Sequence, residues 1–183
     1  MNEDTGDDSD GDSNDVADPT VTTDRNGTVG PGAISPDHDA LLLDAMLGTL
    51  ASYLRMCGYD AAYTPDRGIE EDAAIRSLAA AEARRLITRD RSLAASTPGA
   101  VLLTERETTA QLRELRDAGV KLVLDEHPSR CGVCNGPVER VAEAEDRPEY
   151  APAEGPVWRC LDCGQHYWKG SHWDDVAETL SSL

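Results

Sequence analysis

Two pairs of cysteines near the C-terminus constrain this chain more than any other feature of its sequence. One pair lies in the run CGVC and the other in CLDC, with 25 residues between them; the four are Cys131, Cys134, Cys160 and Cys163. Two such knuckles present four thiolates to one ion and leave no open coordination position, which is typical of structural Zn²⁺. We therefore expect a small zinc ribbon in the C-terminal part of the chain.

Other uses of the cysteines fit the sequence less well. Neither pair opens a helix in a βαβ context, as a redox pair does, and a catalytic zinc keeps one position for water. The fifth cysteine, Cys57, falls on a predicted helix and is most simply a buried, small apolar residue. No apolar run reaches the ~18 residues of a membrane span, and the N-terminus lacks a signal-peptide pattern. We expect a cytoplasmic protein, in which paired cysteines bind metal.

The net charge is strongly negative. The 183 residues include 35 acidic and 17 basic side chains, a formal net charge of −18, and the only lysines are Lys121 and Lys169. We interpret this composition as adaptation to a cytoplasm rich in salt, against the alternative of a mesophilic protein that happens to be acidic. Residues 1–39 carry almost nothing to bury, so we expect them to form a disordered acidic tail.

Between the tail and the ribbon, short apolar runs alternate with segments of helical spacing. This alternation predicts an α/β domain over residues 40–126, with a parallel sheet and helices on both faces, and leaves 127–183 for the ribbon and a last helix. The expected strands are 41–43, 59–63, 86–88, 101–104 and 120–124. The expected helices are 46–57, one beginning at 70–72, 107–118 and 174–183, and Gly58 stands where the left-handed cap of the first is expected.

Acidic residues follow the predicted strands. Asp44, Asp90 and Glu105 come at or just after the ends of the first, third and fourth strands, and Asp72 lies in the first turn of a crossover helix. The carboxyl ends of parallel strands meet at one edge of a sheet, where functional crevices form. Converging carboxylates are unfavourable without a cation, and hard oxygen ligands suit Mg²⁺ or Mn²⁺. Each acid taken alone could instead be a helix cap or a solvated side chain.

Other aspartate-based α/β enzymes match less well. Phosphatases with an Asp-x-Asp motif need a second aspartate, but Asp44 is followed by Ala45 and Met46, and no Gly-rich phosphate loop is present. The arginines beside the third strand, Arg89 and Arg91, could neutralise phosphate or could pair with surface acids. The sequence leaves these two interpretations open.

The segment after the ribbon, YWKGSHW, combines aromatic, cationic and histidine side chains. Stacking on bases and contact with phosphate use these residue types, so Lys169 and His172 are candidate RNA contacts. For Trp168 and Trp173 themselves, packing beneath a domain too small to have a large core is the favoured interpretation. A non-catalytic RNA-binding or adaptor module that uses the ribbon is therefore an alternative to an enzyme.

Several of these segments together carry a family resemblance. The runs LLLDAMLGTLASYLRMCGYD and LITRDR, the two knuckles and YWKGSHW resemble the Mut-seven C-terminal RNase domain family, in a haloarchaeal-type member, from about Leu41 to the C-terminus. The resemblance implies a PIN-like nuclease domain joined to a zinc ribbon, with ribonuclease activity at a Mg²⁺ or Mn²⁺ site and RNA as substrate.

The same resemblance assigns residues by position. It implies catalytic, metal-binding roles for Asp44, Asp72 and Asp90, and zinc ligation by the four cysteines. The choice among Glu70, Glu71 and Asp72 stays open because the family has several acids at this point, and no motif secures Glu105.

Overall fold

The computed structural model describes residues 33–142 and 147–183. Most of the predicted acidic tail, residues 1–32, lies outside these ranges. The described part begins with a packed segment: Ile34 is buried, forms a parallel bridge with Val120, and donates its backbone N–H to the carbonyl of Gly119 at 2.9 Å. Packed structure therefore includes residues ahead of the expected start at Ala40.

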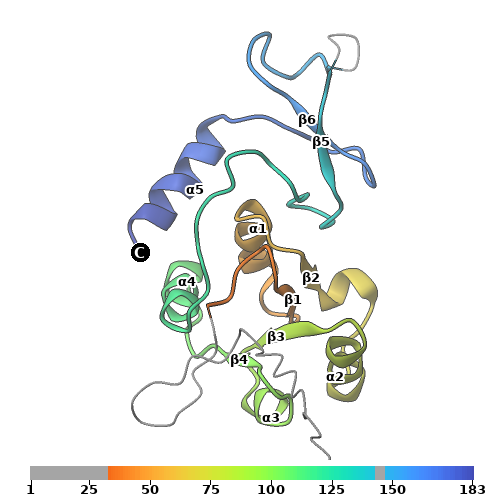
Figure 1. The fold of residues 1–183 in the computed structure, drawn as a ribbon, viewed down its shortest axis with the longest axis vertical. Helices are drawn as coiled ribbons and strands as arrows, with labels where there is room; N and C mark the ends of the chain where they lie inside the picture. Colours follow the sequence, from red (N-terminus) through yellow and green to blue (C-terminus); the bar gives the residue numbers. More distant parts are fainter. Residues whose placement is uncertain (1–32, 143–146) are drawn as a thin grey trace, which may run out of the picture. The chain divides into compact units, whose positions relative to one another are not determined.

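A four-stranded parallel sheet forms the centre of the fold (Figure 1). Its strands are β1 (Ala40–Leu43), β2 (Ala61–Tyr63), β3 (Arg84–Thr88) and β4 (Val101–Leu102), in the order β2-β1-β3-β4. Leu41, Leu42 and Leu43 are each fully buried, because β1 is an inner strand with helices over both of its faces. The parallel α/β architecture predicted from the sequence is confirmed.

Helices cover both faces of this sheet. On one face, α1 (Gly48–Met56) and α4 (Thr108–Asp117) pack with Leu41 and Leu43, and on the other α2 (Asp72–Ala81) and α3 (Arg91–Ala95) pack with Leu42. A 3₁₀ helix, η1 (Thr64–Arg67), follows β2. Gly58 has φ +87° just after α1, the left-handed conformation that its sequence position predicts. No helix in the described part of the chain is long and apolar enough to cross a membrane.

The strand expected at 101–104 ends at Leu102, the last helix begins at Ser171 rather than 174, and two further expectations differ in the kind of structure formed. Residues 120–124 do not form a strand, because only Val120 finds a partner, the single residue Ile34, and no further ladder follows. In place of a plain loop between β3 and β4, the chain forms the one-turn helix α3, in which the N–H of Leu93 donates to the side chain of Asp90.

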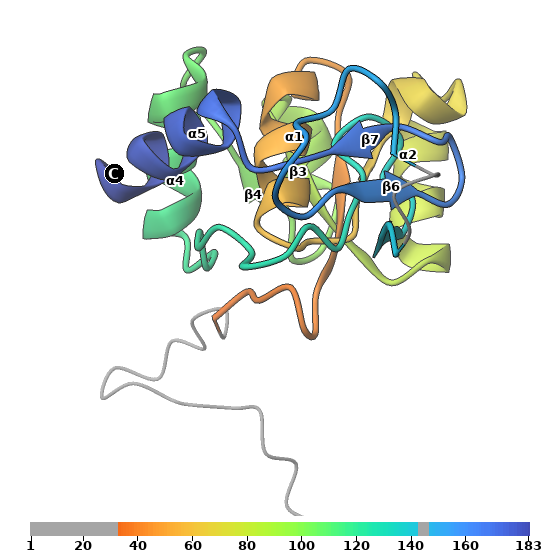
Figure 2. The same cartoon turned by 90° about the horizontal axis from the view of Figure 1, so that it is seen from above.

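A three-stranded antiparallel sheet carries the two cysteine knuckles. Its strands are β5 (Val138–Arg140), β6 (Trp158–Cys160) and β7 (His166–Tyr167), in chain order. Trp158, at 3% exposure, is the tryptophan that packs this small sheet. After it, α5 (Ser171–Ser181) lies on the side of α1 and α4 (Figure 2), where Leu180 and Leu183 contact the main core. The predicted boundary between residues 126 and 127 stays a prediction.

The first knuckle is joined to the α/β core by a buried arginine. Arg55 of α1 is only 3% exposed. Its Nε donates to the carbonyl of Ala61 at 2.9 Å, and its Nη1 donates to the carbonyls of Gly132 and Val133 at 3.1 and 3.0 Å. The guanidinium also pairs with Asp66 at 3.3 Å. One charged side chain thus ties α1, the edge strand β2 and the CGVC turn together.

A second link runs through Asn135, which follows the first knuckle with φ +67°. Its side-chain oxygen accepts the N–H of Ala61 at 3.0 Å, and its amide nitrogen donates to Asp60 at 2.7 Å. Asp60 also accepts two hydrogen bonds from Arg84, at 2.8 and 3.1 Å. Both backbone polar groups of Ala61, on the edge strand of the sheet, are therefore satisfied by side chains of α1 and the knuckle.

Candidate functional site

Asp44 and Asp90 stand at the carboxyl ends of two neighbouring strands, and a buried threonine connects them. Thr88, the last residue of β3, is fully buried. Its hydroxyl donates to Asp44 Oδ2 at 2.7 Å and accepts the backbone N–H of Asp90 at 2.9 Å. The backbone of Asp44 also donates to the carbonyl of Ile87 at 3.1 Å. The end of β1 and the turn after β3 are thus fixed against each other.

Both aspartates keep capacity to bind something further. Asp44 Oδ1 accepts the N–H of Ala45 at 2.6 Å, and Asp90 Oδ1 accepts the N–H of Leu93 at 2.8 Å. A carboxylate has about four lone-pair sites. Asp44 is half-buried and Asp90 is exposed, so their remaining sites can face an ion or a ligand.

The acids near residue 70 lie on the α2 side of the same edge. Asp72 is the first residue of α2, Glu71 is the residue before the helix, and both are exposed, as is Glu70. Among residues 33–142 and 147–183, one group of three or more potential metal ligands has its ligand atoms all within 4.8 Å of one another. This group is the four cysteines. The structure therefore connects Asp44 with Asp90 and does not bring Asp72 into such a group.

Just after the end of β4, the backbone binds the carboxylate of Glu114, a residue of α4. Glu114 accepts the backbone N–H groups of Thr104 and Glu105 at 3.0 and 3.2 Å, and also the Thr104 hydroxyl. Burial alone would raise the pKa of Glu114, but these hydrogen bonds and the charge of Arg89 hold it below its ordinary value. Glu105 is exposed. Sequence reasoning missed Glu114, because only the packing of α4 brings it to the strand end.

The two arginines after β3 differ in their surroundings. Arg89 lies close enough to Glu114 to lower the pKa of that carboxyl. Arg91 is the first residue of α3 and is exposed. Of the two, Arg91 has the position that suits contact with a ligand at the rim formed by Asp44 and Asp90.

The four cysteines form a compact group. Cys131 Sγ lies 3.6 Å from Cys163 Sγ, and Cys134 Sγ lies 3.5 Å from Cys160 Sγ. Four sulfurs placed tetrahedrally at the Zn–S distance of ~2.3 Å would be ~3.8 Å apart, which agrees with these spacings. Backbone N–H groups of Cys134 and Cys163 point at the sulfurs of Cys131 and Cys160, at 3.4 and 3.5 Å. The group can hold a metal ion, as the CxxC spacing predicts.

Tyr167 belongs to the same centre and was not singled out from the sequence as a partner of the cysteines. Its hydroxyl lies 2.9 Å from Cys131 Sγ. Burial alone would raise the pKa of Cys131, but hydrogen bonds from Tyr167 and from the backbone lower it to about 7. Such contacts to the sulfur support the thiolate form, which is the form that binds metal.

Comparison with known proteins places this architecture in a family. The model of the Mut7-C RNAse domain matches residues 39–180. This chain belongs to the Mut7-C RNAse domain family. The match runs from the start of β1 through both knuckles to α5, so it includes the sheet and the cysteine centre together. Neither a search of curated proteins nor a search of solved structures found a match.

In this Mut7-C member, the segment after the knuckles does not fill the core of the small sheet. Trp168 and Trp173 are partly exposed and line a pocket of about 240 Å³ together with residues of α1. Lys169 and His172 are exposed, and the Lys169 Nζ lies 5.3 Å from the centre of the Trp173 ring. The two candidate RNA contacts therefore lie beside an open aromatic surface.

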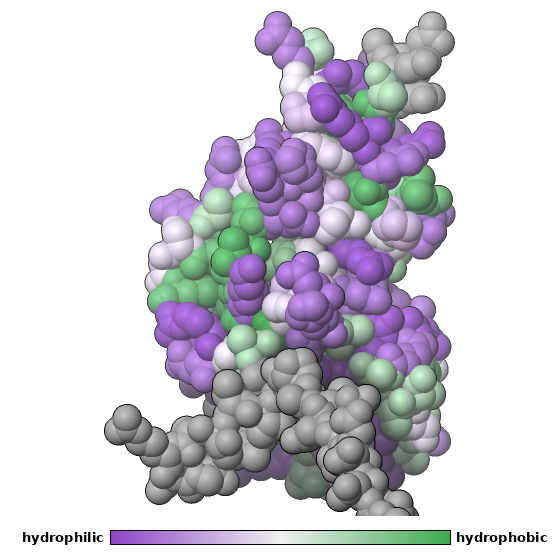
Figure 3. All heavy atoms as spheres, viewed as in Figure 1, coloured by the Kyte–Doolittle hydropathy of each residue, from purple (hydrophilic) through white to green (hydrophobic). Residues whose placement is uncertain are grey.

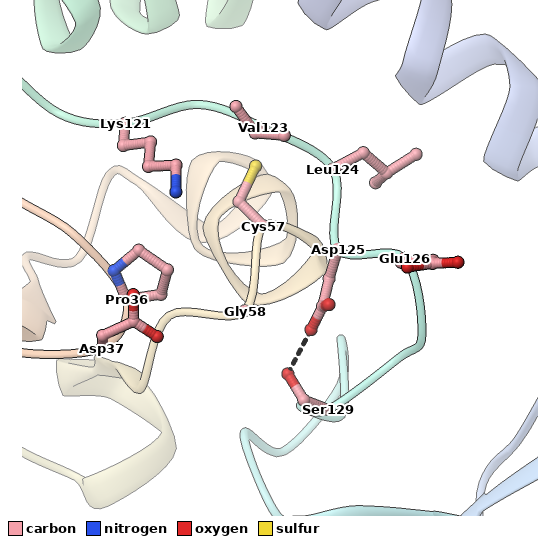
Figure 4. Close-up of a pocket in the computed structure, with 10 residues that line it drawn as sticks. All are labelled: Pro36, Asp37, Cys57, Gly58, Lys121, Val123, Leu124, Asp125, Glu126 and Ser129. Atoms are coloured by element: carbon pink, nitrogen blue, oxygen red, sulfur yellow. Dashed lines mark hydrogen bonds between the residues drawn. The ribbon is translucent and has the colours of Figure 1, made fainter.

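A larger pocket of the Mut7-C domain lies away from the acidic rim (Figure 4). Its volume is about 510 Å³, and its lining includes Asp37, which precedes β1, and Gly58, which precedes β2, so it sits at the amino ends of the strands. Cys57 lines it, and burial together with the charge of Asp125 raises the pKa of this thiol to about 12. The thiol stays protonated, in agreement with the interpretation of Cys57 as a buried apolar residue.

Proposed function

We propose that this chain is a divalent-metal-dependent ribonuclease that cleaves RNA phosphodiester bonds at the carboxyl edge of its parallel sheet. Asp44 and Asp90 are the central acids in this proposal, and Asp72 is the third. The observation that carries it is the hydrogen-bonded unit of Asp44, Thr88 and Asp90 at the ends of two adjacent strands. Membership of an RNase domain family supports the substrate class.

The residues at this rim fit a hard divalent cation. Mg²⁺ is usually held by one or two carboxylates and keeps waters and substrate phosphates as its other ligands, so a close cluster of three acids is not required. Mg²⁺ or Mn²⁺ bound by Asp44 and Asp90 would supply an activated water and stabilise charge on the phosphodiester.

The chain's own residues have separate tasks in this reaction. Thr88 fixes the rotamer of Asp44 and the backbone position of Asp90 at the same time. Asp90 is held in its turn by capping α3. Arg91, exposed at the start of α3, is placed to contact a phosphate, and Asp72 adds negative charge from the start of α2.

The test is cleavage of end-labelled RNA at high KCl, with Mn²⁺ or Mg²⁺ omitted and then restored. Asp44→Asn and Asp90→Asn should each abolish metal-dependent cleavage, whereas Asp117→Asn, an exposed acid at the end of α4, should cleave as the wild type does. Wild-type cleavage by the Asp44→Asn, Asp90→Asn double variant would show that the reaction occurs elsewhere.

Thr88 offers a finer test of the same site. Thr88→Val keeps the shape of the side chain but removes the bonds to Asp44 and Asp90, so cleavage should slow by about 10-fold or more. Thr88→Ser, which keeps the hydroxyl, should recover most of the rate. Equal rates for the valine and serine variants would remove Thr88 from the site.

The cysteine centre is proposed to hold one structural Zn²⁺ in a ribbon attached to a PIN-like domain. All four ligands are thiols at distances that suit zinc, and all four positions are filled by protein. This geometry supports a structural role and leaves the reaction to the carboxylates.

Strong negative charge does not oppose an RNA substrate when salt is high. At molar salt the Debye length is ~3 Å, so repulsion between the acidic surface and the RNA is largely screened. Attraction by basic groups is weakened by the same salt. RNA recognition would then depend on bound metal, on a few arginines and on stacking.

A non-catalytic RNA-binding or adaptor module remains the second candidate. The aromatic pocket beside the first knuckle favours it, because this pocket requires none of the rim carboxylates. RNA binding with no metal-dependent cleavage in a preparation that retains its zinc would decide for this alternative.

A further inference from the structure

A groove follows one side of helix α1 along its whole length. Its first part, about 400 Å³, is lined by Gly48, Thr49, Ser52, Tyr53, Met56, His172 and Val176. Its second part is the 240 Å³ pocket already described, and the two share Ser52, Met56 and His172. The two pockets therefore lie next to each other along α1, with α5 and the segment that leads into it on their other side.

The groove begins close to the acidic rim. Gly48, at the start of α1, comes four residues after Asp44, and Met56 ends the helix. A rise of 1.5 Å per residue puts these two ends ~12 Å apart. A strand of nucleic acid lying in the groove would thus have one part at the rim and another part a few nucleotides away, beside the tryptophans.

The far end of the groove suits a flat, apolar group. Trp168 and Trp173 line it, together with Met56 and with Val133 of the first knuckle, which is 63% exposed. The pocket is smaller than the ~300–1,000 Å³ that encloses drug-sized ligands, so it has room for one ring system. Unpaired bases stack on such tryptophan faces whatever their sequence.

Positive charge collects at this end, in a chain whose net charge is −18. Lys169 lies over the ring of Trp173, and Arg130 lines the same pocket, with its Nη2 3.9 Å from Asp60 Oδ2. The acids nearest to Lys169 in the sequence, Asp174 and Asp175, lie in the first turns of α5. The face drawn in Figure 3 is largely hydrophilic, with a larger hydrophobic area on the side of α5 and α4.

We propose that this groove binds an unpaired RNA strand, holding one base against Trp168 and Trp173 and the adjoining phosphate with Lys169 and Arg130. The inference rests on the proposed function only in that the bound strand leads to Asp44. A paired base is already stacked and has its faces covered, so the pocket selects single-stranded RNA. The segment after the knuckles is then part of the substrate site as well as a structural link.

The experiment measures binding of a short fluorescent single-stranded RNA to the full-length, zinc-containing protein, without Mg²⁺ or Mn²⁺, over a range of KCl concentrations. Trp173→Ala should weaken binding about fivefold or more, the factor that corresponds to the low end of base–aromatic stacking. Trp173→Phe should bind more tightly than Trp173→Ala, because it keeps an aromatic face. A duplex of the same sequence should bind more weakly than the single strand.

The chain has two lysines, so one can be tested and the other can serve as its matched control. Lys169→Ala should weaken binding and lower the slope of log affinity against log salt by ~0.7, the value for one phosphate contact on a single strand. Lys121→Ala, which lines the pocket at the other edge of the sheet, should leave affinity and slope unchanged. Equal slopes for the two variants, or equal affinity for single strand and duplex, would overturn the proposal.

A readout on the unmodified protein covers the case in which a tryptophan variant does not fold. Single-stranded RNA should quench the tryptophan fluorescence of the wild type, and an absence of quenching at saturating RNA would also overturn the proposal. Asp117→Asn protein, the control used for cleavage, should bind as the wild type does. Normal binding without cleavage by the wild type would contradict the proposed function alone, and cleavage without groove-dependent binding would contradict this inference alone.

Discussion

Arg55 provides the sharpest test of how the knuckle and the α/β core hold together. Arg55→Met keeps most of the apolar length of the side chain but removes the guanidinium. The carbonyls of Ala61 and Val133 then lose their side-chain donor, whereas the carbonyl of Gly132 keeps the hydroxyl of Ser52 at 3.2 Å.

The magnitude follows from these contacts. A hydrogen bond to a charged group contributes ~1.5–3 kcal/mol, and a buried carbonyl without a donor costs ~1–3 kcal/mol. The carbonyl of Ala61 is buried, whereas that of Val133 is part-buried and Asp66 is 44% exposed, so the loss should lower the free energy of unfolding by about 3 kcal/mol. For a chain of this size that loss corresponds to a melting temperature lower by roughly 10 °C.

The assay is urea unfolding at constant high KCl, with zinc content measured on the same samples. Arg116→Met is the matched control, because Arg116 pairs with Asp117 at 3.0 Å but both side chains are largely exposed, at 46% and 68%. An exposed pair contributes at most ~1 kcal/mol. If Arg55→Met and Arg116→Met lose the same stability, the buried arginine does not join the two parts of the chain as argued.

Two further predictions concern the zinc content of the protein and its stability at acidic pH. Protein purified without chelators should contain one zinc per chain, and Cys131→Ser or Cys163→Ser should destabilise the C-terminal region, because zinc supplies folding free energy that a small ribbon core lacks; a zinc-free but fully folded preparation would refute this. Burial alone would raise the pKa of Asp60, but hydrogen bonds from Arg84 and Asn135 hold it below its ordinary value. The stability that ionised Asp60 contributes to the fold is therefore fully present above the unfolded pKa of ~3.9 and is lost as pH falls through the lower pKa of the folded state. Asp60→Asn should flatten the acid side of the profile of stability against pH. An unchanged profile would contradict the assignment.

Local signals explain why much of the α/β domain could be predicted. The run Leu41 to Leu43 is apolar at every position, as a strand buried on both faces requires, and the glycine at 58 marks the end of the first helix. Asp44 and Asp90 are placed by the ends of their own strands, so their positions at one edge also follow from the sequence.

The remaining features depend on contacts between distant segments. Glu114 reaches the end of β4 only because α4 packs back along the sheet, and Arg55 finds its partners in a knuckle 77 residues further along the chain. The segment 120–124 is apolar enough to be a strand but its one β-bridge is with Ile34, a residue that composition had assigned to the tail. A sequence pattern within a single segment therefore cannot predict these contacts.

The capping of Ala61 by Asn135 and Arg55 has a consequence for self-association. β2 is an edge strand, and an uncovered edge offers its N–H and C=O groups as a template for pairing with another chain. The knuckle that supplies Asn135 depends on its thiols being gathered together, so loss of zinc would expose this edge. Light scattering should therefore rise when a chelator removes zinc, and to a lesser extent in Asn135→Ala. A zinc ion at the proposed site would then keep the chains apart as well as keeping each one folded.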